Sequence, residues 1–153
     1  MKHIKAILIV LFGILLDQIT KYYVAHNFIQ GARQKVIDGF FYLTYVRNTG
    51  AGFSILQGQR WVFIILTFIA LPLFIYLYVK SDPGHKLERF AYLLLISGTI
   101  GNFIDRVLYG SVVDFLDFII FGYDFPVFNV ADIFITVGVG LYLLLTLLET
   151  KHA

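Results

Sequence analysis

Apolar residues dominate four long segments of this chain, and shorter polar segments separate them. We predict the apolar segments at residues 4–24, 61–79, 90–108 and 127–148. A helix of about 20 apolar residues crosses the hydrocarbon core of a bilayer, so each segment is long enough to span a membrane. Trp61 at one end of the second segment, and Tyr76 and Tyr78 at the other, fit the aromatic belts that flank a span. The pattern predicts four transmembrane helices.

The first apolar segment begins like a secretory signal peptide, because Lys2 and Lys5 precede the apolar run at residues 6–16. No cleavage site with small residues follows, so we predict an uncleaved helix over residues 4–24. Asp17 and Lys21 are four residues apart and share one helix face. They are either supporting residues in the interior of the bundle or an ion pair at the helix end, with Lys21 extending toward water.

A β-strand pattern follows the first span. Asp38-Gly39 is a strong signal for a tight turn, and residues 40–46 after it are nearly all β-branched or aromatic. We predict a β-hairpin over residues 36–46, within a β segment of about 34–48. Strands this aromatic, between two spans, indicate a small sheet on the membrane surface.

The composition agrees with a membrane protein. Of the 153 residues, 59% are hydrophobic and 14% charged, and the mean hydropathy is +0.80. These values are typical of a polytopic membrane protein, and the length favours one domain, residues 1–153. The net charge of +2 and the lack of a basic tract argue against a nucleic-acid partner.

Several chemistries are disfavoured by the residues that are missing. Cysteine is absent, which excludes disulfides, thiolate nucleophiles and cysteine-ligated metals. The four histidines lie near the termini or the ends of spans, and no HExxH motif occurs. We therefore expect neither a metal nor a cofactor.

Acidic residues gather between Gly98 and Asp132, in a chain that is otherwise mostly hydrocarbon. They are Asp105, Asp114, Asp117, Asp124 and Asp132. A carboxylate at bilayer depth costs roughly 2.5–3.5 kcal/mol even on lenient insertion scales, so we expect some of these groups to have a function. Two of them could form an intramembrane aspartic-protease dyad.

The spacing of these acids leaves alternatives open. Asp114 comes just after the third span and Asp132 at the start of the fourth, so both could reach one pocket near the outer face of the membrane. Asn129 and Asp132 also match a helix capping box. Solvation in an interfacial loop is the preferred interpretation of Asp117 and Asp124. Spacing alone does not select Asp114 over Asp117.

The third span carries small and polar residues at helical spacing. Gly98 and Gly101 form a face that lets another helix approach closely. Asn102, Asp105 and Arg106 follow. We favour a bracing role for these three over direct catalysis; the alternative is that Arg106 extends toward water while Asp105 bonds locally.

Four spans place both termini on one side of the membrane. Lysine and arginine divide evenly between the two sides, but they are denser at the termini and in the loop at 80–89. The positive-inside rule therefore predicts cytoplasmic termini, with the segments 25–60 and 109–126 outside. We interpret 109–126 as a loop.

Five motifs, in order along the chain, resemble the bacterial lipoprotein signal peptidases, also called signal peptidase II. They are Asp17-Gln18-x-x-Lys21, Asn48-Thr49-Gly50-Ala51, Gly101-Asn102-x-x-Asp105-Arg106, Val112-Val113-Asp114-Phe115 and Phe128-Asn129-Val130-Ala131-Asp132. The four-span layout agrees, and together the motifs are highly specific. Gly52, where the family often has alanine, is a minor departure.

The resemblance implies an aspartic endopeptidase with Asp114 and Asp132 as the catalytic pair. It also implies supporting or substrate-binding residues: Asp17, Lys21, Asn48, Gly50, Asn102, Asp105, Arg106 and Asn129. The implied substrate is a diacylglyceryl-modified prolipoprotein, cut just before its lipidated cysteine. Globomycin-like cyclic peptides would be inhibitors, membrane lipid would surround the enzyme, and the location would be the bacterial inner membrane, with the active site near its outer face.

The chemistry of paired carboxylates agrees with this. Two carboxyl groups in one site share a proton, so one can take a proton from water while the other protonates the scissile carbonyl. We expect Asp132, near a helix N-terminus, to be the base. The rival interpretations are a small proton-coupled transporter, because intramembrane aspartates also relay protons, and a membrane scaffold without catalysis.

Overall fold

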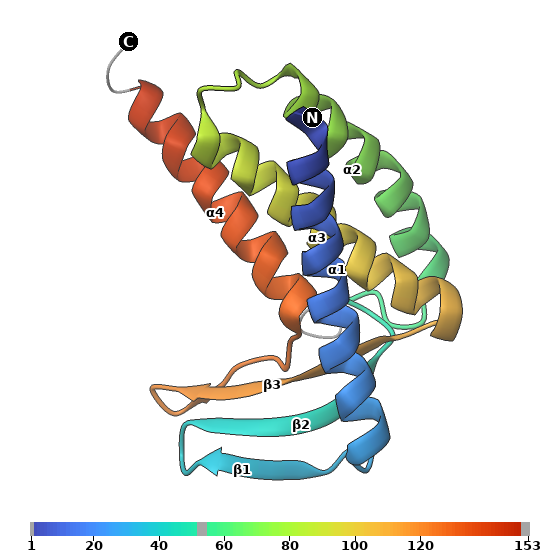
Figure 1. Ribbon diagram of the computed structural model, residues 1–153. Helices are drawn as coiled ribbons and strands as arrows, with labels where there is room; N and C mark the ends of the chain where they lie inside the picture. Colours follow the sequence, from blue (N-terminus) through green and yellow to red (C-terminus); the bar gives the residue numbers. More distant parts are fainter. Residues whose placement is uncertain (1, 52–54, 151–153) are drawn as a thin grey trace.

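The computed structural model describes residues 2–51 and 55–150, so Gly52 and the C-terminal Lys151 lie outside the described residues. Within these ranges, four helices are long and apolar enough to cross a membrane. They are α1 (Lys2–Asn27), α2 (Arg60–Lys80), α3 (Lys86–Tyr109) and α4 (Val130–Thr150). The start of α1 and the end of α4 lie at one end of the bundle, and a small β-sheet lies at the other (Figure 1). The predicted fold class is confirmed.

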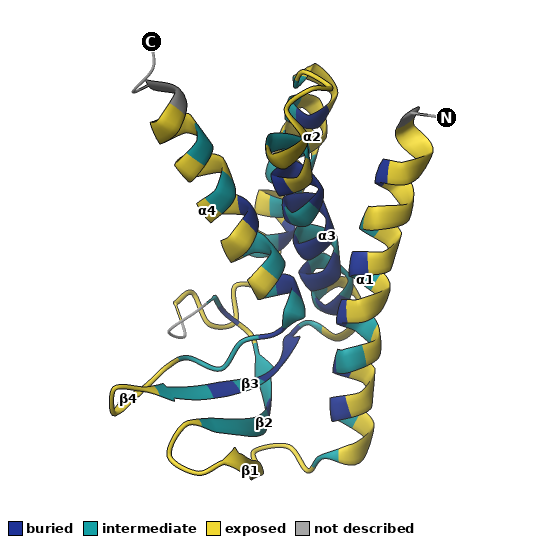
Figure 2. Cartoon of the chain, turned by 60° about the vertical axis from the view of Figure 1, so that its left-hand side comes forward, coloured by how far each residue is buried: buried dark blue, intermediate teal, exposed yellow. Residues whose placement is uncertain are grey.

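Helix α3 is the centre of the bundle and packs against the other three helices. In its apolar window 56% of the residues are buried, against 17% or less in the other three spans. Figure 2 shows the difference as a dark α3 beside largely exposed α1 and α4. Exposed apolar side chains such as Phe12, Phe68 and Leu147 are expected where lipid is the solvent.

Small residues let α1 and α4 approach α3 closely, as the sequence predicts. A Cβ atom on Gly98 would overlap the backbone oxygen of Ala131 in α4. A Cβ atom on Gly101 would lie 2.5 Å from a carboxylate oxygen of Asp17 in α1. Both contacts lie toward the sheet end of α3, so the glycines bring three helices together where polar side chains enter the bundle.

The sheet is antiparallel, with strand order β1-β2-β3-β4. Its strands are β1 (Arg33–Ile37), β2 (Phe41–Asn48), β3 (Val112–Ile120) and β4 (Tyr123–Asp124). The predicted hairpin is present as β1 and β2, and the turn between them places Gly39 at a φ of +69°, which favours glycine. Strands β3 and β4 come from the connection between α3 and α4.

The prediction of a loop at 109–126 is wrong, because β3 pairs with β2 along most of its length. Strand β3 is rich in valine, isoleucine and phenylalanine, which favour a pleated surface, and β2 offers it an edge. Solvation of Asp117 is also wrong: its side chain is 5% exposed and binds Arg33 at 2.8 Å and the hydroxyl of Thr44. Asp124 is exposed, as expected, and also pairs with Arg33.

Candidate active site

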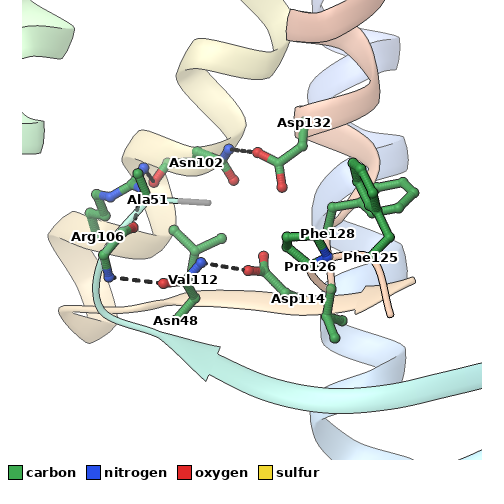
Figure 3. Close-up of a pocket in the computed structure, with 12 residues that line it drawn as sticks. Asn48, Ala51, Asn102, Arg106, Val112, Asp114, Phe125, Pro126, Phe128 and Asp132 are labelled. Atoms are coloured by element: carbon green, nitrogen blue, oxygen red, sulfur yellow. Dashed lines mark hydrogen bonds between the residues drawn. The ribbon is translucent and has the colours of Figure 1, made fainter. Parts of the chain in front are cut away.

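Two carboxyl groups from different elements point into one cavity of about 240 Å³. Asp114 comes from β3 and Asp132 from the first turn of α4 (Figure 3). The other lining residues are Asn48, Gly50, Ala51, Asn102, Arg106, Val112, Phe125, Pro126, Val127 and Phe128. The cavity therefore lies between the sheet and the ends of α3 and α4, and one wall is aromatic.

The Asp114 side chain is 3% exposed, and two amides hold it in place. Asn48 donates to one carboxylate oxygen at 2.8 Å, and Asn129 donates to the other at 2.6 Å. Burial, followed by the nearby charge of Asp132, raises the pKa of Asp114 to about 7. Both amides favour the ionised form, but burial and the like charge outweigh them. Asp114 is therefore suited to carry a proton near neutral pH.

Asp132 begins α4 in the capping box that its spacing predicts. Its backbone N–H donates to Oδ1 of Asn129 at 3.0 Å, and the backbone N–H of Asn129 donates back to Oδ2 of Asp132 at 3.1 Å. The Asn102 side chain donates to Oδ1 of Asp132 at 2.7 Å. Asp132 therefore both caps α4 and lines the cavity.

Asn102 and Asn129 join the two carboxylates to each other. Oδ1 of Asn102 accepts from Nδ2 of Asn129 at 3.2 Å and from the ammonium group of Lys21 at 2.9 Å. An oxygen that accepts twice cannot be exchanged for the amide nitrogen, so both donors fix the orientation of Asn102. That orientation in turn directs the Asn102 NH₂ group to Asp132.

A buried ionic cluster lies behind the asparagines. Lys21 is 3% exposed and pairs with Asp17 at 2.9 Å and with Asp105 at 3.3 Å. Gln18 donates to both of these carboxylates. The alternative in which Lys21 extends toward water is wrong, and so is the one in which Asp105 bonds only locally. Both side chains point inward because α1 and α3 offer them partners there.

Each carboxylate of this cluster holds the residue before a catalytic candidate. Asp17 accepts the backbone N–H of Ala131 at 2.9 Å, and Ala131 precedes Asp132. Asp105 accepts the backbone N–H of Val113 at 3.1 Å, and Val113 precedes Asp114. Lys21 lies between the two, so one ammonium group connects the supports of both candidates. We call Lys21, Asp17 and Asp105 the buried triad.

Arg106 and Gly50 form another wall of the cavity. Arg106 donates to the backbone oxygen of Gly50 at 3.1 Å, and its guanidinium group lies 4.5 Å from the centre of the Phe63 ring. Extension of Arg106 toward water is therefore wrong. The Gly50 N–H donates to Oδ1 of Asn48, which orients the amide that holds Asp114.

The structure brings all the predicted site residues to this region, in two layers. The cavity layer holds Asp114, Asp132, Asn48, Gly50, Asn102 and Arg106, and the layer behind it holds Asn129 and the buried triad. The aromatic wall, Phe125 and Phe128, was missed: Phe125 fell in the segment interpreted as a loop, and Phe128 was quoted in a motif and placed in the fourth span without a role in the site. Gln18 was also missed as a site residue, although it lies between Asp17 and Lys21 in sequence.

Known proteins resemble this chain over most of its length. A family model described as signal peptidase (SPase) II matches residues 9–148. A lipoprotein signal peptidase of Shouchella clausii (strain KSM-K16) is 46% identical over 96% of this chain and 95% of its own. One from Staphylococcus aureus (strain MRSA252) is 44% identical over 96% and 90%. A bacterial membrane enzyme solved by the in meso method at 2.3 Å resolution superposes with a TM-score of 0.91, at 43% identity, over 97% of this chain and 90% of that one.

Proposed function

The chain belongs to the signal peptidase II family, and we propose that Asp114 and Asp132 are the catalytic pair with which it cuts its substrate. It is an aspartic endopeptidase that removes the signal peptide from prolipoproteins. The family assignment made from five motifs is confirmed. None of the relatives named above is a transporter, so the proton-coupled alternative has no support.

One observation carries the catalytic assignment: two carboxyl groups from separate elements face one cavity, and among the described residues their hydrogen-bond partners are side-chain amides and a backbone N–H group. Asp132 accepts two hydrogen bonds and lies in the first turn of α4. The raised pKa of Asp114 favours its protonated form. The pair therefore offers one base and one acid.

In the proposed reaction, the Asp132 carboxylate takes a proton from water while the water oxygen attacks the scissile carbonyl carbon. Asp114 gives its proton to the carbonyl oxygen. When the tetrahedral intermediate collapses, the leaving nitrogen receives the proton held by Asp132, and the hydroxyl proton returns to Asp114. Each carboxylate oxygen of Asp114 accepts one hydrogen bond from the protein, which leaves lone pairs directed at the cavity for this proton.

The remaining site residues act through the pair. Asn48, Asn102 and Asn129 hold the carboxylates, while Asp17, Asp105 and Lys21 hold the backbone beside them. Arg106, whose guanidinium group lines the cavity together with Gly50, would bind the peptide backbone of the substrate.

For the substrate, we propose a prolipoprotein that carries a diacylglyceryl group, with cleavage just before the lipidated cysteine. An apolar cavity of about 230 Å³ adjoins Asp132 and is lined by Phe125, Phe128, Ile133, Thr136 and Val137. It lies along α4, where acyl chains could pass from the bilayer to the carboxylates without crossing water. Globomycin-like cyclic peptides would occupy the same cavities as inhibitors.

The strand order argues against binding of the substrate peptide as an added strand of the hairpin at 36–46. Strand β2 lies between β1 and β3, so both of its edges are occupied. Strand β1 has the remaining free edge of the hairpin, but none of its residues lines the catalytic cavity. We place the peptide instead beside the segment from Asn48 to Ala51.

We propose that the enzyme is a single domain in the bacterial cell membrane, with cytoplasmic termini and the site near the outer face. The positive-inside rule counts basic residues in loops. Lys21 and Arg106 belong by sequence to the outer side, but they point into the protein. Without these two, basic residues are in excess on the side of the termini, which supports this orientation.

The test is cleavage of a lipidated prolipoprotein by the purified enzyme in detergent. Asp114→Asn and Asp132→Asn should each abolish release of the signal peptide, whereas Asp124→Asn should cleave at the wild-type rate. Asp124 is a matched control because it is an aspartate of the same connection but is 68% exposed. Normal turnover by either of the first two variants would disprove the assignment of the pair.

A further inference from the structure

A second cavity of about 350 Å³, lined by both polar and apolar residues, lies on the other side of α3 from the catalytic cavity. The two share no lining residue. Neighbouring cross-strand pairs lie between them: Asn48 and Val112 line the catalytic cavity, whereas Arg47 and Val113 line the second one. Arg47 also lines a further cavity of about 400 Å³, together with Asn48 and Asp114. Lys21 and Asp105 of the buried triad contribute to its lining, but the proposed reaction places no substrate in this second cavity.

Arg47 is the notable group of the second cavity. Its Nε donates to the hydroxyl of Tyr45 at 2.8 Å, and its guanidinium carbon lies 5.2 Å from the centre of the Tyr109 ring. Each of the other described arginines uses at least one terminal nitrogen to bind a protein oxygen, whereas the terminal nitrogens of Arg47 have no acceptor among the residues that the structure describes. A fork of N–H groups is thus available to a ligand, and a guanidinium fork matches the oxygens of a phosphate.

The floor of the cavity does not oppose an anion there. Asp105 contributes to the lining, but it is 2% exposed. Its carboxylate oxygens accept from Lys21, Gln18 and the backbone of Val113. Arg47 therefore provides the accessible charge at the mouth of the cavity.

The rim lies at the depth of lipid headgroups. Tyr22 and Tyr109 are 65% and 61% exposed, and tyrosines mark the membrane–water boundary. The His26 ring lies against the Tyr22 ring, and Nδ1 of His26 donates to the backbone oxygen of Tyr22, so Nε2 is available to a ligand. Apolar surface continues from the rim toward the bilayer at Ile19, which is 62% exposed.

We propose that this second cavity binds an anionic glycerophospholipid, with the phosphodiester group on Arg47 and the acyl chains along the exposed faces of α1 and α3. The positive charge of Arg47 matches the phosphodiester group, the apolar part of the lining matches the acyl chains, and the rim lies at the depth of the headgroup. Basic pockets between transmembrane helices bind anionic headgroups in the same way. Neither Asp114 nor Asp132 lines this cavity, and the proposal does not depend on the proposed reaction.

The experiment measures lipid retained by the purified full-length chain in neutral detergent, by native mass spectrometry. The probes are phosphatidylglycerol and phosphatidylcholine with the same acyl chains. The wild type should retain one phosphatidylglycerol per chain at concentrations where phosphatidylcholine is lost. Arg47→Gln should weaken this binding about tenfold or more, since a charge-assisted pair is removed. Lys35→Gln, which removes an exposed basic residue of β1, should bind as the wild type does.

Two further measurements make the result decisive. Ile19→Trp should also weaken binding, because it fills the mouth from the lipid side without altering charge, and it covers the case in which Arg47→Gln unfolds at a lower temperature than the wild type. Free glycerol 3-phosphate should not displace the lipid. Equal retention of phosphatidylcholine, displacement by glycerol 3-phosphate, or unchanged binding in the Ile19→Trp variant would overturn the proposal.

Discussion

At the scale of single residues, the environment of Asp114 sets a pH dependence. Its pKa is raised to about 7, first by burial and then by the charge of Asp132. The proposed acid is the protonated form, so the active fraction falls as the pH rises through this value. We predict that the turnover number at saturating substrate falls about tenfold per pH unit on the alkaline side.

The variant Asn48→Ala tests whether the pKa of Asp114 causes this fall in turnover, which is the alkaline limb of the pH profile. Asn48 donates to Asp114 and favours its ionised form, so its removal should raise the pKa of Asp114 and move the limb to higher pH. The measurement is the pH profile of turnover between about pH 5.5 and 9. A flat profile in the wild type, or a limb that moves to lower pH in Asn48→Ala, would contradict the proton assignment.

Lys21 is the cation of the buried triad. Lys21→Met leaves Asp17 and Asp105 buried without a cation, and removing one partner of a buried ion pair costs about 3–5 kcal/mol. We expect a lower unfolding temperature in detergent. Because the triad also holds the backbone beside both catalytic candidates, we expect the turnover number to fall by more than the KM rises.

Lys35→Met is the matched control for this prediction. Lys35 pairs with Asp38 on the surface, where both side chains are more than half exposed, and such a pair contributes about 0–1 kcal/mol. The control should unfold and turn over as the wild type does. Equal losses in the two variants would show that Lys21 is not a special support of the site.

Sequence reasoning succeeded at residues whose partners are close in the chain. The capping box of Asn129 and Asp132 and the pair of Asp17 and Lys21 follow from spacings of three and four residues. It failed for Asp117, because its partner Arg33 lies 84 positions away. A single sequence contains no local signal for such a contact.

At the scale of elements, the close contact between α3 and α4 sets the position of Asp132. Gly98 lies against the backbone of Ala131, directly before Asp132. We predict that Gly98→Ala pushes the start of α4 away from α3, and displacement of a catalytic group by about 1 Å can cost about 100-fold in rate. The measurement is prolipoprotein turnover. Gly140→Ala, where a new methyl group would meet nothing within 4 Å, should retain wild-type turnover.

The elements themselves were predicted unequally. The four spans follow from the length of the apolar segments, and the hairpin follows from its Asp-Gly turn. Strand β3 was missed because Asp114 and Asp117 interrupt its apolar run and resemble the polar residues of a loop. Each aspartate is buried only because another element supplies its partner: β2 supplies Asn48, and β1 supplies Arg33. The local pattern therefore misleads where tertiary contacts satisfy the polar groups.

At the scale of the whole molecule, the proposed orientation can be tested with single cysteines, because the chain contains none. Asp38 lies in the turn of the sheet and His85 between α2 and α3, and each is an exposed member of a surface ion pair. In intact cells, a membrane-impermeant maleimide should label Asp38→Cys. It should label His85→Cys only after the membrane is permeabilised. The reverse pattern would place the termini outside.

The hydrogen bonds of Asn102 have a consequence for drug resistance. Its side chain binds Lys21, Asn129 and Asp132 at once, so a substitution there would disturb both carboxylates. A compound that binds these same polar atoms would therefore leave a bacterium few escape mutations that keep the enzyme active. Resistance should arise instead at the aromatic wall, at Phe125 and Phe128, whose side chains can change shape while the polar contacts remain.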